Sequence, residues 1–349
     1  MLHATDALFS HASPTPLLAL APMQDVTDLP FWGLIKDYGG ADLYYTEYFR
    51  VHATSTLEPW IRDSITKNPT GRPVIAQMIG NDIPALVRTV RQLQTLPIVG
   101  IDLNLGCPAP VVYRKCAGGG LLRELDKVDS ILGALRDAVS IKFSVKTRVG
   151  FDDPATFDKL LPILARHSLD LLTVHGRTVK EMYWAEVRYD FIQHAAGVMP
   201  CPVLANGNIH SAAHALEIWR MTGCRGVMLG RGAIRNPWMF QQIRQMLAGE
   251  NITQPTGRTV LAYISALYEA VTEPGVRDSS QVQKMKKYLN FIGAGVEPGG
   301  EFLHRIRRCQ SRAEFFEICR RFLEHDRPLP LEPFPEQKPI LAESACPTA

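Results

Sequence analysis

The chain has 349 residues, of which 46% are apolar and 21% charged, and its formal net charge is +3. This composition is that of a soluble globular protein with one large domain and a smaller one. No stretch of about 18 apolar residues occurs, and the opening MLHATDALFS lacks a secretory signal, so we expect a cytoplasmic protein without a membrane span. The weak positive charge permits a nucleic-acid partner but does not require one.

Eight short apolar runs recur between residues 17 and 234, and each ends in polar or glycine residues. They are 17–23, 43–50, 74–80, 100–108, 143–150, 171–178, 202–209 and 226–234. Helical patterns separate them, so we expect parallel strands covered by helices. Eight strands in this length favour an α/β fold of the (βα)8 TIM-barrel type, and an open doubly wound sheet is the alternative.

The helices between these strands are predicted from apolar residues at helical spacing. Ser211 is placed to cap the start of one helix and Gly223 its end. The three apolar stripes are Ile83, Leu86, Val87, Val90 and Leu93; Val128, Ile131, Leu132, Leu135 and Val139; and Ala212, Ala215, Leu216 and Trp219.

The pattern changes near residue 255, where helical stretches follow one another without strands. They are 258–272, 278–292, 299–309 and 311–325, and Thr256-Gly257 is the expected hinge. We therefore expect a barrel domain over 1–250, a small all-helical domain over 255–325 and a poorly ordered proline-rich tail over 326–349.

The strand ends carry the residues that could do chemistry, because the carboxyl ends of barrel strands form the active-site rim. Asn206-Gly207-Asn208 ends the seventh run and Gly230-Arg231-Gly232 the eighth. Glycines let backbone N–H groups approach a phosphate, and Arg231 adds charge, so we interpret these loops as a phosphate site. The alternative is a pair of tight turns that bind nothing.

Four polar side chains lie within or at the end of apolar strands. Lys146 would need an anion or a polar ligand inside the barrel, such as the N1–O2 edge of a flavin, unless it faces the helices and pairs with a carboxylate. His175 and Arg177 alternate onto one side and suit phosphate or carbonyl recognition, although a structurally satisfied histidine is also possible. Gln77 suits the imide edge of a flavin or a nucleobase.

Cys107, in Asn104-Leu105-Gly106-Cys107-Pro108, lies where the fourth strand should open into a loop. A thiol there is a plausible general acid. Cys116 is its nearest competitor, and the glycines that follow it could permit close approach of a bulky substrate. The seven cysteines, at 107, 116, 201, 224, 309, 319 and 346, form no CxxC pair, so we expect reduced thiols and neither a metal site nor a disulfide framework.

Basic residues gather in the helical segment. Between Arg277 and Arg321 there are ten Lys and Arg against five Asp and Glu, and Arg305, Arg307 and Arg308 lie together. Concentrated positive charge is the footprint of a phosphate-binding surface, whereas solvated helix faces are the alternative interpretation.

Taken in order, these motifs resemble the tRNA-dihydrouridine synthase family of bacterial type. The matching segments are APMQDVTD (21–28), QMIG (77–80), DLNLGCPAPVVYRKCAGGGLL (102–122), VKTRVG (145–150), VHGRT (174–178), ANGNI (205–209) and MLGRGAIRNPW (228–238). The first segment departs from many relatives, which have a small residue near Asp25, so the subfamily and the D-loop position modified stay open.

The resemblance implies an FMN-bound barrel that is reduced by NADPH and that reduces uridine in the D-loop of tRNA to 5,6-dihydrouridine. Hydride would pass from flavin N5 to uracil C6, and Cys107 would give a proton to C5 after the base leaves its stack. We expect a monomer without a metal. The implied cofactor residues are Pro22, Met23, Gln24, Gln77, Asn104, Lys146, His175, Asn206, Gly207, Asn208, Gly230 and Arg231, and the implied tRNA contacts are Arg148, Arg177, Arg305, Arg307 and Arg308.

Three other functions are weighed against this one. A small-molecule FMN reductase would share the flavin elements but would not need a basic helical tail. A non-catalytic RNA-binding barrel would be expected to lose Lys146 or Cys107, and both are present. An aldolase-type barrel could use Lys146 as a Schiff-base lysine, and would lack the yellow colour of a flavoprotein.

Overall fold

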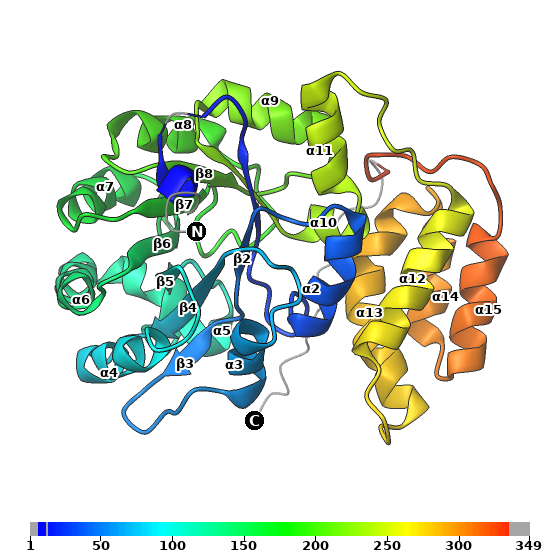
Figure 1. The fold of residues 1–349 in the computed structure, drawn as a ribbon, viewed down its shortest axis with the longest axis horizontal. Coiled ribbons are helices and arrows are strands. Elements are labelled where there is room, and N and C mark those ends of the chain that lie inside the picture. Colours follow the sequence, from blue (N-terminus) through cyan, green and yellow to red (C-terminus); the bar gives the residue numbers. More distant parts are fainter. Residues whose placement is uncertain (1–5, 12, 335–349) are drawn as a thin grey trace.

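A closed parallel barrel forms the body of the molecule in the computed structural model, which describes residues 6–11 and 13–334 (Figure 1). The first strand pairs with the last, with Leu17 beside Gly226, and β2 pairs with β4, with Tyr44 beside Val74, so the barrel is closed. Its strands are β1 (Leu17–Leu20), β2 (Leu43–Tyr45), β4 (Val74–Gly80), β5 (Gly100–Leu105), β6 (Lys142–Arg148), β7 (Leu171–His175), β8 (Val203–Asn206) and β9 (Gly226–Leu229). The predicted (βα)8 barrel is confirmed, and the open sheet is excluded.

The expected second strand, 43–50, is wrong as one continuous element. The chain forms β2, leaves the ladder at Glu47 and Tyr48, and then pairs with β4 again as β3 (Phe49–Val51). Glu47 accepts a hydrogen bond from the Asp25 amide, and Tyr48 turns toward the barrel mouth, so the interruption places two side chains at the rim.

Helices cover the outside of the barrel (Figure 1). The three predicted stripes are buried for the most part, although Trp219 is half-buried and Ile218 faces inward beside it. Ser211 accepts a hydrogen bond from the His214 amide, and Gly223 ends that helix at a φ of 64°, as expected. The helices are α2 (Leu29–Ile35), α3 (Pro59–Thr66), α4 (Ile83–Leu93), α5 (Pro110–Tyr113), α6 (Leu125–Ala138), α7 (Thr156–Arg166), α8 (Tyr189–Val198), α9 (Ala212–Thr222), α10 (Arg231–Arg235) and α11 (Met239–Ala248).

The four C-terminal helices form a separate layer beside α2 and α10 (Figure 1). They are α12 (Gly257–Val271), α13 (Asp278–Ile292), α14 (Glu301–Arg308) and α15 (Arg312–Leu323), close to the predicted ranges. Buried tyrosine hydroxyls fasten this layer to the barrel: Tyr288 donates to the Val26 carbonyl at 3.0 Å and Tyr263 to the Ile234 carbonyl at 2.9 Å. The helical layer is therefore fixed against the same rim that carries the polar strand ends.

The chain after α15 returns to the barrel. Leu329 donates its amide to the Pro255 carbonyl at 2.8 Å, and the Phe334 amide donates to the Ala294 carbonyl at 3.0 Å. Arg235 donates to the carbonyls of Pro330 and Leu331. The beginning of the proline-rich segment is thus anchored where a poorly ordered tail is expected, and 335–349 lie outside the described residues.

Two further findings concern the described part of the chain. None of its helices combines the length and the apolar character that a membrane span requires. Its His, Cys, Asp and Glu side chains form no group of three or more that could hold a metal ion.

Candidate active site at the carboxyl ends of the strands

A cavity of about 640 Å³ opens at the carboxyl ends of the barrel strands, and α13 of the helical layer forms one wall through Asn290 and Phe291. Thirteen of the residues singled out in the sequence line it: Pro22, Met23, Gln24, Asn104, Cys107, Lys146, Arg148, His175, Asn206, Gly207, Asn208, Gly230 and Arg231. The polar strand ends therefore converge on one place, as the barrel topology predicts.

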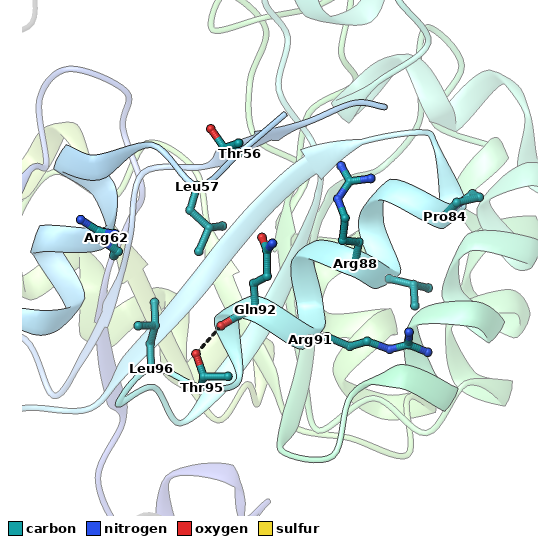
Figure 2. Close-up of a pocket in the computed structure, with 10 residues that line it drawn as sticks. Thr56, Leu57, Arg62, Pro84, Arg88, Arg91, Gln92, Thr95 and Leu96 are labelled. Carbon is teal, nitrogen blue, oxygen red and sulfur yellow. Dashed lines mark hydrogen bonds between the residues drawn. The ribbon is translucent and has the colours of Figure 1, made fainter. Parts of the chain in front are cut away.

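A second hollow of about 880 Å³ lies on the outer flank of the barrel, between α3 and α4 (Figure 2). Its lining combines apolar side chains such as Leu57 and Leu96 with Arg62, Arg88 and Arg91. The Arg88 guanidinium donates to the carbonyls of His52 and Ser55. Among the described residues, none at a strand's carboxyl end lines this hollow, so it lies apart from the polar groups that converge at the barrel rim.

One corner of the cavity is positively charged. Arg231 donates to the Asn208 side-chain oxygen at 2.7 Å, and Arg177 reaches the same oxygen at 3.4 Å. Burial first, and then the charges of Arg231 and Arg148, lower the pKa of Arg177 to about 10. Gly207 adopts a φ of 125°, which favours glycine. An anion bound beside Arg231 and Arg177 would offset the repulsion between these cations.

Lys146 points into the cavity rather than toward the helices. Its ammonium donates to the Asn206 side-chain oxygen at 3.1 Å, and no described carboxylate forms a salt bridge with it. Burial, followed by the charge of Arg148, lowers its pKa to about 8. The alternative of a lysine paired in the helix layer is excluded, and the ammonium has donors left for a ligand.

Two other polar atoms at the cavity lack partners within the described residues. They are the buried Nδ1 of His175 and the buried Oε1 of Gln24. Burial and then the charges of Arg148 and Lys146 hold the pKa of His175 well below its usual value, so the imidazole is neutral. A buried polar atom without a partner costs free energy, and a polar ligand would relieve that cost.

Cys107 is held through its backbone at the end of β5. Its amide donates to the Asn104 side-chain oxygen at 2.9 Å, and its carbonyl accepts from the Gly119 amide at 3.2 Å. A Cβ on Gly119 would lie 2.8 Å from that carbonyl, so the glycines after Cys116 allow the chain to pack on Cys107 rather than admit a bulky substrate. Burial raises the pKa of the Cys107 thiol, which keeps it protonated at neutral pH.

Two of the expected tRNA contacts support the protein's own backbone. Arg148 lines the cavity, but its guanidinium donates to the carbonyls of Gly106, Thr178 and Met182. Arg177 is 1% exposed, donates to the Ala185 carbonyl and does not line the cavity. Both arginines fix the loops of the rim and leave few donors for a nucleotide.

The remaining predicted residues lie apart from the cavity. Gln77 is buried beneath it, and the three arginines of α14 lie in the helical layer. Arg305 pairs with Glu301 at 2.6 Å, whereas Arg307 donates to Asn290, itself a cavity residue. Sequence reasoning missed lining residues that come from loops, from α10 and from the helical layer: Tyr48, Met182, Tyr183, His210, Arg235, Asn290, Phe291, Ala294 and Pro333.

Comparison with known proteins gives one consistent result. The profile of the dihydrouridine synthase (Dus) family matches residues 19–325. The chain is 28% identical to the tRNA-dihydrouridine(16) synthase of Neisseria meningitidis over 88% of its own length and 95% of the relative's. It is 30% identical to the tRNA-dihydrouridine(16) synthase of Cupriavidus necator, over 86% and 95% of the two lengths, and 35% identical to a probable tRNA-dihydrouridine synthase of Helicobacter pylori, over 65% and 70%.

Solved structures show the same architecture at low identity. Histamine dehydrogenase from Rhizobium sp. 4-9 superposes with a TM-score of 0.53 at 11% identity, covering 89% of this chain and 62% of that one. TcOYE with pHBA gives 0.50 at 11% identity, covering 74% and 95%. These likenesses support the fold alone. With its family profile matched over most of its length and a rim cavity that gathers the motif residues, the chain belongs to the dihydrouridine synthase family.

Proposed function

We propose that this protein reduces uridine in the D-loop of tRNA to 5,6-dihydrouridine, with FMN as its cofactor and NADPH as the electron donor. One observation carries the proposal: a single cavity holds a protonated thiol, a buried ammonium with spare donors and a separate positively charged corner. This corner, formed by Arg231, Arg177 and Asn208, is called the anion corner below. The relatives from Neisseria and Cupriavidus, which match over nearly their full length, carry position 16 in their names, so uridine 16 is the first position to test.

The residues present fit a flavin mononucleotide. The unpaired atoms of His175 and Gln24 and the ammonium of Lys146 offer polar partners to the isoalloxazine edge, and Arg231 with Asn208 suits the phosphate. Pro22 and Met23 border the same cavity. Asn104 lines the cavity, and Gln77 lies buried beneath it and accepts a hydrogen bond from Asn104.

The reaction adds a hydride and a proton across the uracil C5–C6 bond. Reduced FMN supplies the hydride when it is bound. Cys107 gives its thiol proton to C5, and the thiolate that remains is stabilised by the nearby charges of Arg148 and Lys146 and by the Ala109 amide. Solvent protons then restore the thiol. We place this chemistry in a catalytic barrel domain over 1–250, and we assign tRNA binding to a helical domain over 255–325.

The experiment that tests the proposal begins with an absorbance spectrum of the purified protein. Flavin bands should bleach on addition of NADPH, and unmodified tRNA should restore them while gaining 2 Da at the uridine position by mass spectrometry. Bleaching without tRNA reduction would indicate a flavin reductase for small molecules. A colourless protein that FMN cannot reconstitute would overturn the proposal and favour an aldolase-type reaction at Lys146.

FMN affinity should weaken as the pH rises through about 8, where the Lys146 ammonium loses its proton. Bound flavin favours the charged lysine, so binding raises its pKa and is strongest below that pH. Fluorescence titration of the apoprotein from about pH 7 to about pH 9.5 measures this. Lys146→Arg keeps its charge and should show no inflection near 8; a flat wild-type profile would contradict the placement of Lys146.

Replacing Arg305, Arg307 and Arg308 by glutamine should weaken tRNA binding. Each lost phosphate contact reduces the steepness of the plot of log K against log salt by about 0.7 to 0.9. The slope of the triple variant should therefore be shallower than that of the wild type by up to about 2 to 3. Because Arg305 pairs with Glu301, its own contribution to tRNA binding should be the smallest of the three.

A matched control removes the same charge from the outer barrel, by changing Arg62, Arg91 and Arg220 to glutamine. These side chains are exposed on α3, α4 and α9. Filter binding over a salt series should leave this variant close to wild type. Equal losses in both triple variants would mean that net charge, and not the helical surface, governs binding.

A further inference from the structure

A chain of buried hydrogen bonds leads from the barrel interior to Cys107. We propose that Asp102 is the positioning residue for Cys107 and acts through Gln77 and Asn104, an inference that rests on the proposed function. Asp102 Oδ2 accepts from Gln77 Nε2 at 2.8 Å, and Gln77 Oε1 accepts from Asn104 Nδ2 at 2.9 Å. Asn104 Oδ1 then accepts the Cys107 amide at 2.9 Å.

The order of donors and acceptors fixes the orientation of both amides. Each side-chain amide has an acceptor end and a donor end, whereas an ionised carboxylate only accepts. Because Asp102 only accepts, Gln77 must turn its NH₂ toward it and its oxygen toward Asn104. Asn104 must then turn its own oxygen toward the loop that carries Cys107. Reversing either amide would bring two donors face to face.

Asp102 has no direct access to the reaction. It is 0% exposed and does not line the cavity, and its register partner on β4 is Gln77. Its other carboxylate oxygen accepts from the Ser144 hydroxyl at 2.6 Å. A buried carboxylate carries a desolvation cost, which here raises its pKa to about 6. Its hydrogen bonds go to Gln77, the first link of the chain to Cys107, and to Ser144, and its charge also acts on Lys146.

Both backbone polar groups of Cys107 are used, its amide by Asn104 and its carbonyl by Gly119. Two hydrogen bonds therefore hold the loop at Cys107, and the one to Asn104 depends on Asp102. Asn104 Oδ1 also accepts the Gly106 amide at 2.9 Å, so a turned Asn104 would leave two buried amides without an acceptor. The thiol would then lose its fixed position at the cavity.

The test compares Asp102→Leu with Ser144→Ala. The leucine keeps a branched side chain of somewhat larger volume but removes the acceptor for Gln77, and the control removes the other partner of the same carboxylate. The first readout is the iodoacetamide alkylation rate of Cys107, resolved by peptide mass mapping on the purified flavin-loaded protein without tRNA. Asp102→Leu should raise that rate at least about threefold, because a loosened loop exposes the thiol, and Ser144→Ala should stay within about twofold.

The second readout is uridine reduction under saturating tRNA. Asp102→Leu should lower kcat at least about tenfold with KM for tRNA unchanged, since a misplaced proton donor slows chemistry but not binding. Asp102→Asn should recover most of the activity, because its amide oxygen can face Gln77 while its NH₂ faces the Ser144 hydroxyl. Asp102→Ala replaces the leucine variant if circular dichroism shows that the latter does not fold.

Two results would overturn the proposal. One is a wild-type alkylation rate of Cys107 in Asp102→Leu, and the other is a loss of uridine reduction in Ser144→Ala as large as that in Asp102→Leu. The alkylation readout needs no tRNA substrate. If the wild-type protein fails to reduce uridine while Asp102→Leu still exposes the thiol, the positioning chain stands and the proposed function fails.

Discussion

Replacing Cys107 with alanine should lower the rate of uridine reduction by about 10² to 10⁴, the range that a general acid contributes. Among the described residues, Cys107 is the one cysteine that lines the cavity. FMN content and bleaching by NADPH should be unchanged, since the flavin is reduced before the proton is needed. Stopped-flow measurement of flavin reoxidation by tRNA separates the two half-reactions.

Cys116→Ala is the matched control. Cys116 follows on the same loop but does not line the cavity, and its sulfur lies 3.6 Å from an Arg123 nitrogen. This variant should reduce uridine at the wild-type rate. Wild-type activity in Cys107→Ala, or equal losses in the two variants, would remove the general-acid role from Cys107.

The pH dependence of reoxidation follows from the same thiol. A proton donor works only while it is protonated, so the rate should be level at neutral pH and fall as the pH rises through the thiol pKa. Burial raises that pKa above its ordinary value, which moves the fall to higher pH. Cys107→Ser should lose the alkaline fall together with most of the rate, because a serine hydroxyl is a far weaker acid.

The sequence predicts this site well for most of the polar residues that stand on a strand, Gln77 beneath the cavity being the exception. Asn104, Lys146 and His175 alternate with apolar neighbours, and parallel register brings Asn104 beside Lys146 on the next strand. Period-two alternation and the barrel topology are enough to send such side chains to one rim. The same reasoning recovers the helix over 212–222, whose capping serine and terminal glycine are local signals.

The prediction fails where the chain turns back after a strand, as at Arg177, and for residues that reach the cavity from distant parts of the chain. Alternation places Arg177 beside His175, but β7 ends at His175, and the turn at Gly176 sends the arginine back to the Ala185 carbonyl. Asn290 and Pro333 reach the cavity from helices and loops far along the chain. Their positions depend on how the helical layer packs on the barrel, and no local pattern encodes that packing.

Replacing Arg231 with alanine should weaken FMN binding by about 10- to 100-fold, equivalent to the roughly 1.5 to 3 kcal/mol of a charge-assisted hydrogen bond. Arg231 is the cation of the anion corner that still faces the cavity, whereas Arg177 is buried and donates to a backbone carbonyl. Fluorescence titration of apoprotein measures the change. The FMN affinity of Arg231→Lys should lie between those of the wild type and Arg231→Ala, because an ammonium keeps the charge but not the paired N–H donors of the guanidinium.

Riboflavin distinguishes a phosphate contact from a general loss of the site. It has the isoalloxazine ring and ribityl chain of FMN without the phosphate, so its affinity should be nearly the same in wild type and in Arg231→Ala. An Arg91→Ala variant on the outer flank should bind both ligands as wild type does, because that side chain lies in the hollow between α3 and α4 (Figure 2). If Arg231→Ala weakens riboflavin and FMN alike, the arginine holds the shape of the rim through Asn208, and the phosphate lies elsewhere.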